Sequence, residues 1–420
     1  MRPGHDITQE TACLSQASSL SSQTISPSGD VFTFKYSRDE VGVNMVARSH
    51  QSDEPLGITA SYASITTKSD DRYQLLEKVK SVLQGSRYRV TSCMQARGSY
   101  VDLMQSGDDF YYSNIMTCGS VWICPVCRPK ILSGRRQEIS QALKSGLTPV
   151  MVTVTLQHDR GDSLDDLMDA LSKSLRRLKS GRWYQDFKKT YRVKASVSTL
   201  EIRWSPVSGW HPHRHWLLFC DVDNMTEDDT VDIQHDLTGR YRYLLDLSGH
   251  YASEYHGIDV RIGDQYIGDY LSKDNWSLAS EMSSTDAKSS SSSVSPFNLV
   301  DMASEGDGQS YHLWREYVDA TYGKRQITWS RGGKSLLGVD DKSDEDLASD
   351  HPGSDEEITE DKADQSPVVL MSISSDIWSL VLRRSSPGRV LEVARQGGQD
   401  AVRSYLDWLV SSMKIRGHPS

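Results

Sequence analysis

The stretch GWHPHRHWLLF, residues 209–219, restricts the folding of this 420-residue chain more than any other. Side chains two apart on a β-strand share one face, so His211, His213, His215 and Leu217 line up together. A single such histidine would ordinarily be a hydrogen-bonded, half-buried strand residue. Three in alternation favour a metal site, because neutral imidazole is the commonest side-chain metal ligand. The sequence therefore predicts a strand with metal ligands at one end and core residues at the other.

The preceding segment supplies a partner strand for these histidines. Residues 195–203 also have the pattern of a strand, and the turn-rich SPVSG between the two segments predicts a hairpin. Glu201, in TLEIRW, then lies opposite the histidines and completes a facial site with open positions for water or a phosphate oxygen. Such a site suits Mg²⁺ or Mn²⁺. Without the histidines, Glu201 would be interpreted as a surface residue of the hairpin.

The cysteines indicate a second metal site. Cys118, Cys124 and Cys127 form C-x₅-C-x₂-C, and the turn C-P-V-C is typical of a structural zinc site. A closed site needs a fourth ligand, for which Cys93 is the best candidate and a distant histidine the alternative. The competing interpretation is three buried free thiols. The crowding of half of the six cysteines into ten residues favours metal binding in a reducing compartment over a disulfide framework.

The charge of the chain is unevenly distributed. The net charge is −10, and residues 340–364 account for it, with 12 Asp and Glu against two Lys. Residues 120–219 carry 17 Lys and Arg against eight Asp and Glu, a net of +9 that fits a polyanion such as DNA. No apolar run approaches the roughly 20 residues of a membrane helix, and the first ten residues lack an apolar signal core. We expect a cytoplasmic protein with no membrane partner.

Hydrophobic periodicity predicts the remaining elements. A buried strand is expected over residues 150–156 and a short one over 258–262. Helices are expected at the following positions: 73–84, 163–178 with Ser163 as N-cap, 226–247, 264–273, and a small set within 377–410. Residues 283–295 form a serine-rich linker, and the hydrophobic content of 37% is low enough to predict long disordered parts.

The segment QYIGDYLSKDNW, residues 265–276, adds a possible nucleophile. On a helix Tyr266 and Tyr270 lie four apart on one face, and Lys273 follows almost one turn later. A phenol beside a divalent metal can attack a phosphodiester covalently, with a nearby cation stabilising the developing charge. Tyrosines at this spacing are more often plain core packing, so the motif gains its weight from the histidines.

Together these motifs resemble the HUH endonuclease superfamily, and in particular the rolling-circle replication initiator (Rep) proteins of plasmids. The resemblance covers roughly residues 88–340, in matching order and spacing. The segments that carry it are CGSVWICPVC, VTVTLQH, GWHPHRHWLLF, YIGDYLSKDNW, SPFNLV and the tract from LWREY to WSRG.

The resemblance implies an α+β fold, with an HUH core of antiparallel sheet and flanking helices. It implies metal binding by His213 and His215, with His211 as a further ligand or as a residue that orients the ligands. Tyr270 matches the nucleophile that leaves a 5′ phosphotyrosine and a free 3′ hydroxyl, and Tyr266 matches a second tyrosine or glutamate position. The partners implied are plasmid origin DNA and the host helicase and polymerase.

Two residues depart from the family pattern. Arg214 stands where a hydrophobic residue usually separates the two ligand histidines, and Asp269 stands where lysine commonly precedes the tyrosine. The alternatives are a catalytically impaired, zinc-containing DNA-binding protein, and an HUH transposase or relaxase. The expected organisation is as follows: disordered segment 1–70, cysteine segment 71–147, HUH nuclease core 148–276, linker and C-terminal part of the Rep region 277–339, acidic linker 340–365, and helical C-terminal region 366–420.

Overall fold

The computed structural model describes residues 21–25, 31–35, 68–262, 294–349 and 366–416, and the chain divides into two units. In the first unit, Met1–Ser64, the strands β1 (Ser21–Ile25) and β2 (Val31–Lys35) form an antiparallel pair. The rest of the segment predicted to be disordered lies outside the described residues up to residue 67. Everything below concerns the second unit, Ile65–Ser420.

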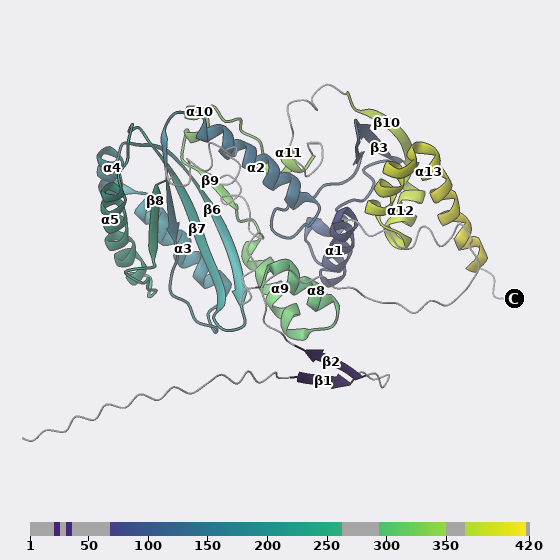
Figure 1. Cartoon of the computed structure of the whole chain (residues 1–420), viewed down its shortest axis with the longest axis horizontal. Helices are drawn as coiled ribbons and strands as arrows, with labels where there is room; N and C mark the ends of the chain where they lie inside the picture. Colours follow the sequence, from purple (N-terminus) through teal and green to yellow (C-terminus); the bar gives the residue numbers. More distant parts are fainter. Residues whose placement is uncertain (1–20, 26–30, 36–67, 263–293, 350–365, 417–420) are drawn as a thin grey trace, which may run out of the picture. The chain divides into compact units, whose positions relative to one another are not determined.

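A five-stranded antiparallel sheet forms the centre of this unit (Figure 1). Its strand order is β8 (Ile258–Ile262), β5 (Thr148–Val154), β7 (Gly209–Cys220), β6 (Val193–Ser205) and β9 (Ile327–Trp329). The resemblance implied an antiparallel sheet with flanking helices, and that arrangement of elements is confirmed. The histidine strand β7 is the middle strand, and backbone hydrogen bonds to β5 and β6 fix its register with both neighbours. The positions of its side chains relative to those of β5 and β6 are fixed as a result.

Among the described residues, three helices cover the face of the sheet that carries the even-numbered residues of β7. They are α3 (Leu164–Leu178), α4 (Gly181–Thr190) and α5 (Glu227–Asp246). Ser163 is the N-cap of α3, as predicted, and accepts a hydrogen bond from the Asp166 amide. A capping box at Thr226 starts α5.

The opposite face, with the odd-numbered residues of β7, changes from apolar to polar along the strand. At the apolar end Leu217 and Phe219 pack with Val197 of β6 against Ile139 of helix α2 (Cys127–Leu143). The histidines lie on the same face beyond this cluster. The pattern read from residues 209–219 therefore corresponds to a strand that begins at a polar site and ends in the core.

Helices α8 (Pro296–Ser304) and α9 (Gly308–Thr321) lie in the chain between Val294, which bridges to Trp204 of β6, and strand β9. The Glu316 carboxylate of α9 accepts hydrogen bonds from the Leu164 amide, at 2.8 Å, and from Trp210 Nε1, at 2.9 Å. This carboxylate joins the N-terminus of α3 to the start of β7. The short helix α10 (Gly333–Leu336) follows β9.

A second, three-stranded antiparallel sheet has the order β10 (Val368–Ser374), β3 (Tyr100–Ser106) and β4 (Asp109–Ser113). The C-terminal region was predicted to be helical, and α12 (Ser375–Arg384) and α13 (Pro387–Arg416) confirm that part. Its first element, however, is a strand, because the β-branched run VVLMSIS pairs with the edge of β3.

The C-terminal helices pack beside the N-terminal part of the unit. Helix α1 (Lys68–Val82) contacts α13, which is interrupted at Gly397 and Gly398, where Gly398 has φ of 61°. Among the described residues, no helix combines the length and apolarity needed to cross a membrane.

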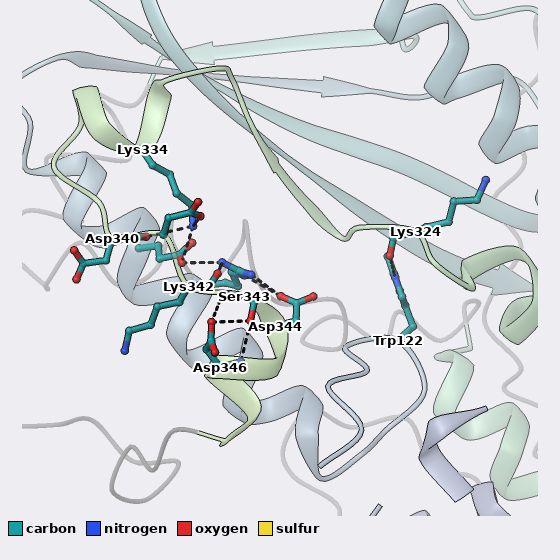
Figure 2. A network of polar contacts seen from close by, with 11 residues as sticks. Trp122, Lys324, Lys334, Asp340, Lys342, Ser343, Asp344 and Asp346 are labelled. Atoms are coloured by element: carbon teal, nitrogen blue, oxygen red, sulfur yellow. Dashed lines mark hydrogen bonds and ion pairs between the residues drawn. The ribbon is translucent and has the colours of Figure 1, made fainter. Parts of the chain in front are cut away.

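The acidic segment folds in part onto helix α2. Residues 340–349 include helix α11 (Asp344–Ser349), and Arg135 of α2 donates to Asp344 Oδ1 at 2.6 Å and to the Lys342 carbonyl at 3.0 Å (Figure 2). Leu347 is buried over Gly134. These ten residues of the predicted acidic linker are therefore folded against α2, since Arg135 and Lys334 form ion pairs with carboxylates of the segment and Leu347 is buried. Residues 350–365 lie outside the described residues.

Candidate metal sites

The strand register brings the predicted carboxylate and two of the predicted histidines together. Glu201 of β6 pairs with His213 of β7, and its Oε2 is 3.0 Å from Nε2 of His213 and 3.4 Å from Nε2 of His215. One ligand atom from each of the three residues lies within 4.8 Å of the others, so the group could hold a metal ion. We call these three residues the Glu/His/His group.

The electrostatics of the group favour an ionised carboxylate. Burial alone would raise the pKa of Glu201, but hydrogen bonds from His213 and His215 hold it well below its usual value. Arg203, two residues along the same strand face, donates to Glu201 Oε1 at 2.6 Å and acts in the same direction. Glu201 is therefore the anion that a cation requires as ligand.

The two imidazoles differ in how their second ring nitrogen is bonded. His215 is held from its other side by Thr153 Oγ1 of β5, 3.2 Å from Nδ1, which fixes the orientation of the ring. The Nδ1 atom of His213 is buried and has no hydrogen-bond partner among the described residues. Two nitrogens and one carboxylate oxygen form a donor set that first-row divalent cations and Mg²⁺ accept.

His211 occupies a different position from the other two histidines. Its ring is 5.2 Å from that of His213, centroid to centroid, yet it lies outside the Glu/His/His group. Its Nδ1 is instead 2.7 Å from Nε2 of His158, which follows β5. Burial, together with the neighbouring His213 and His158, lowers the pKa of His211 to about 4, so its ring is neutral at pH 7.

Arg214 projects to the opposite, helix-covered face of the sheet. It lies between Leu200 and Val154 in register, and burial lowers its pKa to about 10. Burial and the proximity of Arg214 also lower the pKa of Lys179 to about 7, and the Lys179 Nζ is 4.1 Å from the ring centroid of Trp216. In the part of the chain that the structure describes, neither cation forms an ion pair with a carboxylate. Arg214, at which the sequence departs from the superfamily that it resembles, therefore lies away from Glu201.

The tyrosine segment is not placed by the structure. Tyr266, Tyr270, Lys273 and Asp269 fall within residues 263–293, outside the described residues, as does the helix expected at 264–273. Strand β8, which ends at Ile262, is the last described element before them.

The four predicted cysteines form a buried cluster. The Sγ atom of Cys93 is 3.6 Å from that of Cys124 and 3.7 Å from that of Cys127, and Cys118 Sγ is 3.7 Å from Cys127 Sγ. Zinc–sulfur bonds of about 2.3 Å place the corners of a tetrahedron about 3.8 Å apart, so the cluster has nearly the size of a four-thiolate zinc site. Cys93, rather than a histidine, is the fourth residue of the cluster.

The local backbone shapes this cluster. The Cys127 amide donates to Cys124 Sγ at 3.3 Å, and Met94, next to Cys93, has a positive φ of 70° that turns the chain. Hydrogen bonds from Cys118, Cys124 and Cys93 lower the pKa of Cys127, whereas burial raises that of Cys124. None of the cysteines among the described residues forms a disulfide.

Three residues around the Glu/His/His group were not predicted from sequence. Thr153 and Arg203 lie in strands that the sequence predicted, so their place beside His215 and Glu201 follows once the strand register is known. His158 follows the strand β5 in a loop, and no sequence pattern pointed to its contact with His211.

The fold and the sites define a mixed α/β protein with antiparallel sheets, a buried four-cysteine cluster and a Glu/His/His group that could bind a metal ion. The chain is 25% identical over 345 residues to a protein named Protein rep from Streptomyces lividans, covering 64% of this chain and 73% of that protein. It is 28% identical over 146 residues to a neomycin resistance protein from Streptomyces cyanogenus, covering 28% of this chain and 33% of that one. No family model matches, and no solved structure matches.

Proposed function

We propose that this chain is a Rep-type initiator of rolling-circle plasmid replication that nicks one strand of origin DNA. The observation that carries the proposal is the Glu/His/His group at the middle of the antiparallel sheet, in a chain similar to Protein rep over most of its length. The excess of cations in residues 120–219, which include both strands of the hairpin, supports a polyanionic substrate.

In this proposal Glu201, His213 and His215 hold a divalent cation, Mg²⁺ or Mn²⁺, and Arg203 and Thr153 orient them. The cation would polarise a phosphate oxygen of the scissile bond. The hydroxyl of Tyr270 attacks the phosphorus, a phosphotyrosine bond forms at the 5′ side, and the 3′ oxygen leaves as a hydroxyl that primes synthesis. Tyr266 is the second candidate nucleophile, and Lys273 would stabilise the charge on the phosphate.

The cysteine cluster has a different role in the proposal. Four sulfur ligands would leave no open coordination position, so the cluster fits a structural Zn²⁺ and not a catalytic one. Trp122, which lies between Cys118 and Cys124, donates from Nε1 to the Lys324 carbonyl at 2.8 Å (Figure 2). Through this bond the cluster would help to fix the segment that leads into β9.

The experiment is a nicking assay with mapping of the covalent adduct. Purified protein is incubated with Mn²⁺ or Mg²⁺ and a supercoiled plasmid that carries the DNA locus encoding the chain. We expect an open-circular product with protein attached to its 5′ end, and mass spectrometry should place the adduct on Tyr270. Tyr270→Phe should abolish the adduct, while Tyr255→Phe, at a described tyrosine with 78% exposure outside the motif, should leave it unchanged.

The outcomes separate the competing functions. An adduct on Tyr266 with normal nicking by Tyr270→Phe would reverse the order of the two tyrosines. Salt-sensitive DNA binding without metal-dependent cleavage would instead support the catalytically impaired DNA-binding protein. Cleavage confined to the ends of a mobile element or to a transfer origin would favour a transposase or a relaxase.

A further inference from the structure

His158 lies in a loop that is pressed closely against the histidine hairpin. Its Nδ1 is 3.0 Å from the Ser208 carbonyl oxygen in the turn between β6 and β7. At the next residue, Gly209, φ is +77°, and an added Cβ would lie 2.8 Å from the Cα of Arg160. A side chain at position 209 would therefore push the loop away, so the glycine permits the approach that brings His158 to the turn.

The same loop is fixed at its other side. The Gln157 amide donates to the Tyr251 carbonyl at 2.8 Å, and the Thr155 amide donates to the Gly257 carbonyl at 3.0 Å. The Asp159 amide donates to the Asp162 carboxylate at 2.7 Å. His158 thus projects from a backbone that is held on both sides, and its ring has a defined place beside His211.

The hydrogen bonds of His158 determine which nitrogen of His211 carries the hydrogen. A carbonyl oxygen only accepts, so Nδ1 of His158 is its N–H donor, and a neutral ring then has an accepting Nε2. The partner of this Nε2, at 2.7 Å, is Nδ1 of His211, which must therefore donate. The Nε2 atom of His211 consequently keeps its lone pair.

We propose that His158 is a positioning residue of the candidate metal site. By holding His211 with its Nδ1 protonated, it presents Nε2 of His211 as an acceptor for a water or hydroxyl group bound at the Glu/His/His group. The inference deepens the proposed function and rests on it for its catalytic consequence. The placement of the hydrogen on Nδ1 of His211 rests instead on the two hydrogen bonds of His158.

The test compares His158→Ala with His158→Gln. The glutamine carbonyl reaches about as far as Nε2 of histidine and can accept the same hydrogen bond, whereas alanine removes it. The control is His235→Ala, a histidine with a 90% exposed side chain on α5. Imidazole ¹⁵N NMR of histidine-labelled full-length protein, with His211 assigned through His211→Gln, reports which nitrogen carries the hydrogen. Calorimetric titration with Mn²⁺ reports the metal affinity.

We expect His211 to carry its hydrogen on Nδ1 in the wild type, in His158→Gln and in His235→Ala, and to lose this preference in His158→Ala. The Mn²⁺ affinity should fall roughly 2- to 10-fold in His158→Ala, which is the effect of one lost hydrogen bond to a bound water, and by less in His158→Gln. A wild-type His211 protonated on Nε2 would overturn the proposal, even where His158→Ala fails to fold. An unchanged tautomer and affinity in His158→Ala would overturn it too.

These readouts do not depend on DNA cleavage. A wild-type protein that never nicks DNA would contradict the proposed function and leave the ring-orientation result intact. Normal nicking with the wrong His211 tautomer would contradict only the role of His158.

Discussion

Trp378 of α12 joins the C-terminal region to the cysteine cluster. Its side chain is fully buried, its Nε1 donates to the Met94 carbonyl at 2.7 Å, and its ring centroid is 4.6 Å from that of Tyr112. Met94 is the residue next to Cys93. We predict that substitution of Trp378 destabilises the fold and also loosens the cysteine cluster.

Two substitutions separate the ring from the hydrogen bond. Trp378→Ala removes a fully buried indole and should lower the free energy of unfolding by about 3–5 kcal/mol. Trp378→Phe keeps most of the apolar burial but leaves the Met94 carbonyl without its donor, which should cost about 1–3 kcal/mol. Trp408→Phe is the matched control, because Trp408 of α13 is 46% exposed and its replacement should change stability by no more than about 0.5 kcal/mol.

The assays are denaturant unfolding and the rate at which a chromogenic chelator withdraws the zinc proposed for the cysteine cluster from the folded protein. Zinc release should be fastest for Trp378→Ala, intermediate for Trp378→Phe, and equal to wild type for Trp408→Phe. If Trp378→Phe and Trp408→Phe unfold at the same denaturant concentration and release zinc at the wild-type rate, the Met94 contact has no role in holding the cluster.

Three other predictions concern separate parts of the molecule. Cys124→Ser should lose close to one equivalent of zinc by elemental analysis, since Cys124 lies within hydrogen-bonding distance of another thiol of the cluster; an unchanged zinc content would refute the zinc site. Arg135→Ala should lower the free energy of unfolding by about 1.5–3 kcal/mol, because Asp344 and Glu138 lose a charged donor, whereas Arg89→Ala, at a 65% exposed side chain, should cost less than about 1 kcal/mol. Lys179→Met should stabilise the protein by about 1–2 kcal/mol at pH 7 and below, allowing for partial exposure of Lys179 and the lost contact with Trp216. The pKa of Lys179 in the folded protein is about 7, below its ordinary value of 10.5, so the stability of the wild type rises as pH increases from 7 to 10.5. The stability difference between Lys179→Met and the wild type should therefore shrink over this pH range. Thermal unfolding that shows a constant difference would refute the lowered pKa.

The sequence predicted the central hairpin and its neighbouring helix because their signals are local. The alternation over residues 209–219 and the leucine spacing of α3, over 15 residues, are each recognised within one continuous segment of the sequence. The place of Glu201 opposite His213 followed from a short turn, which limits the possible registers of a hairpin.

The features that sequence did not predict depend on contacts between distant residues. Strand β10 exists as a partner of β3, and helix α11 exists because Arg135 and Gly134 of α2 receive Asp344 and Leu347. A run of carboxylates favours solvation when considered alone, and only the structure shows the cations that reverse this preference. His158 belongs to the same class, since its partner lies 53 residues away.

The pairing of β10 with β3 also has a consequence for biosynthesis. All four cysteines have been translated by residue 127, yet Trp378, which binds next to Cys93, comes 284 residues after Met94. At about 5–20 residues per second, roughly 15–60 s pass on the ribosome between these two residues. During that interval the edge of β3 has no β10 to pair with and the cysteine loop lacks its C-terminal cover. A metal ion that binds the cysteine cluster would therefore reach it more easily before the last helices have emerged.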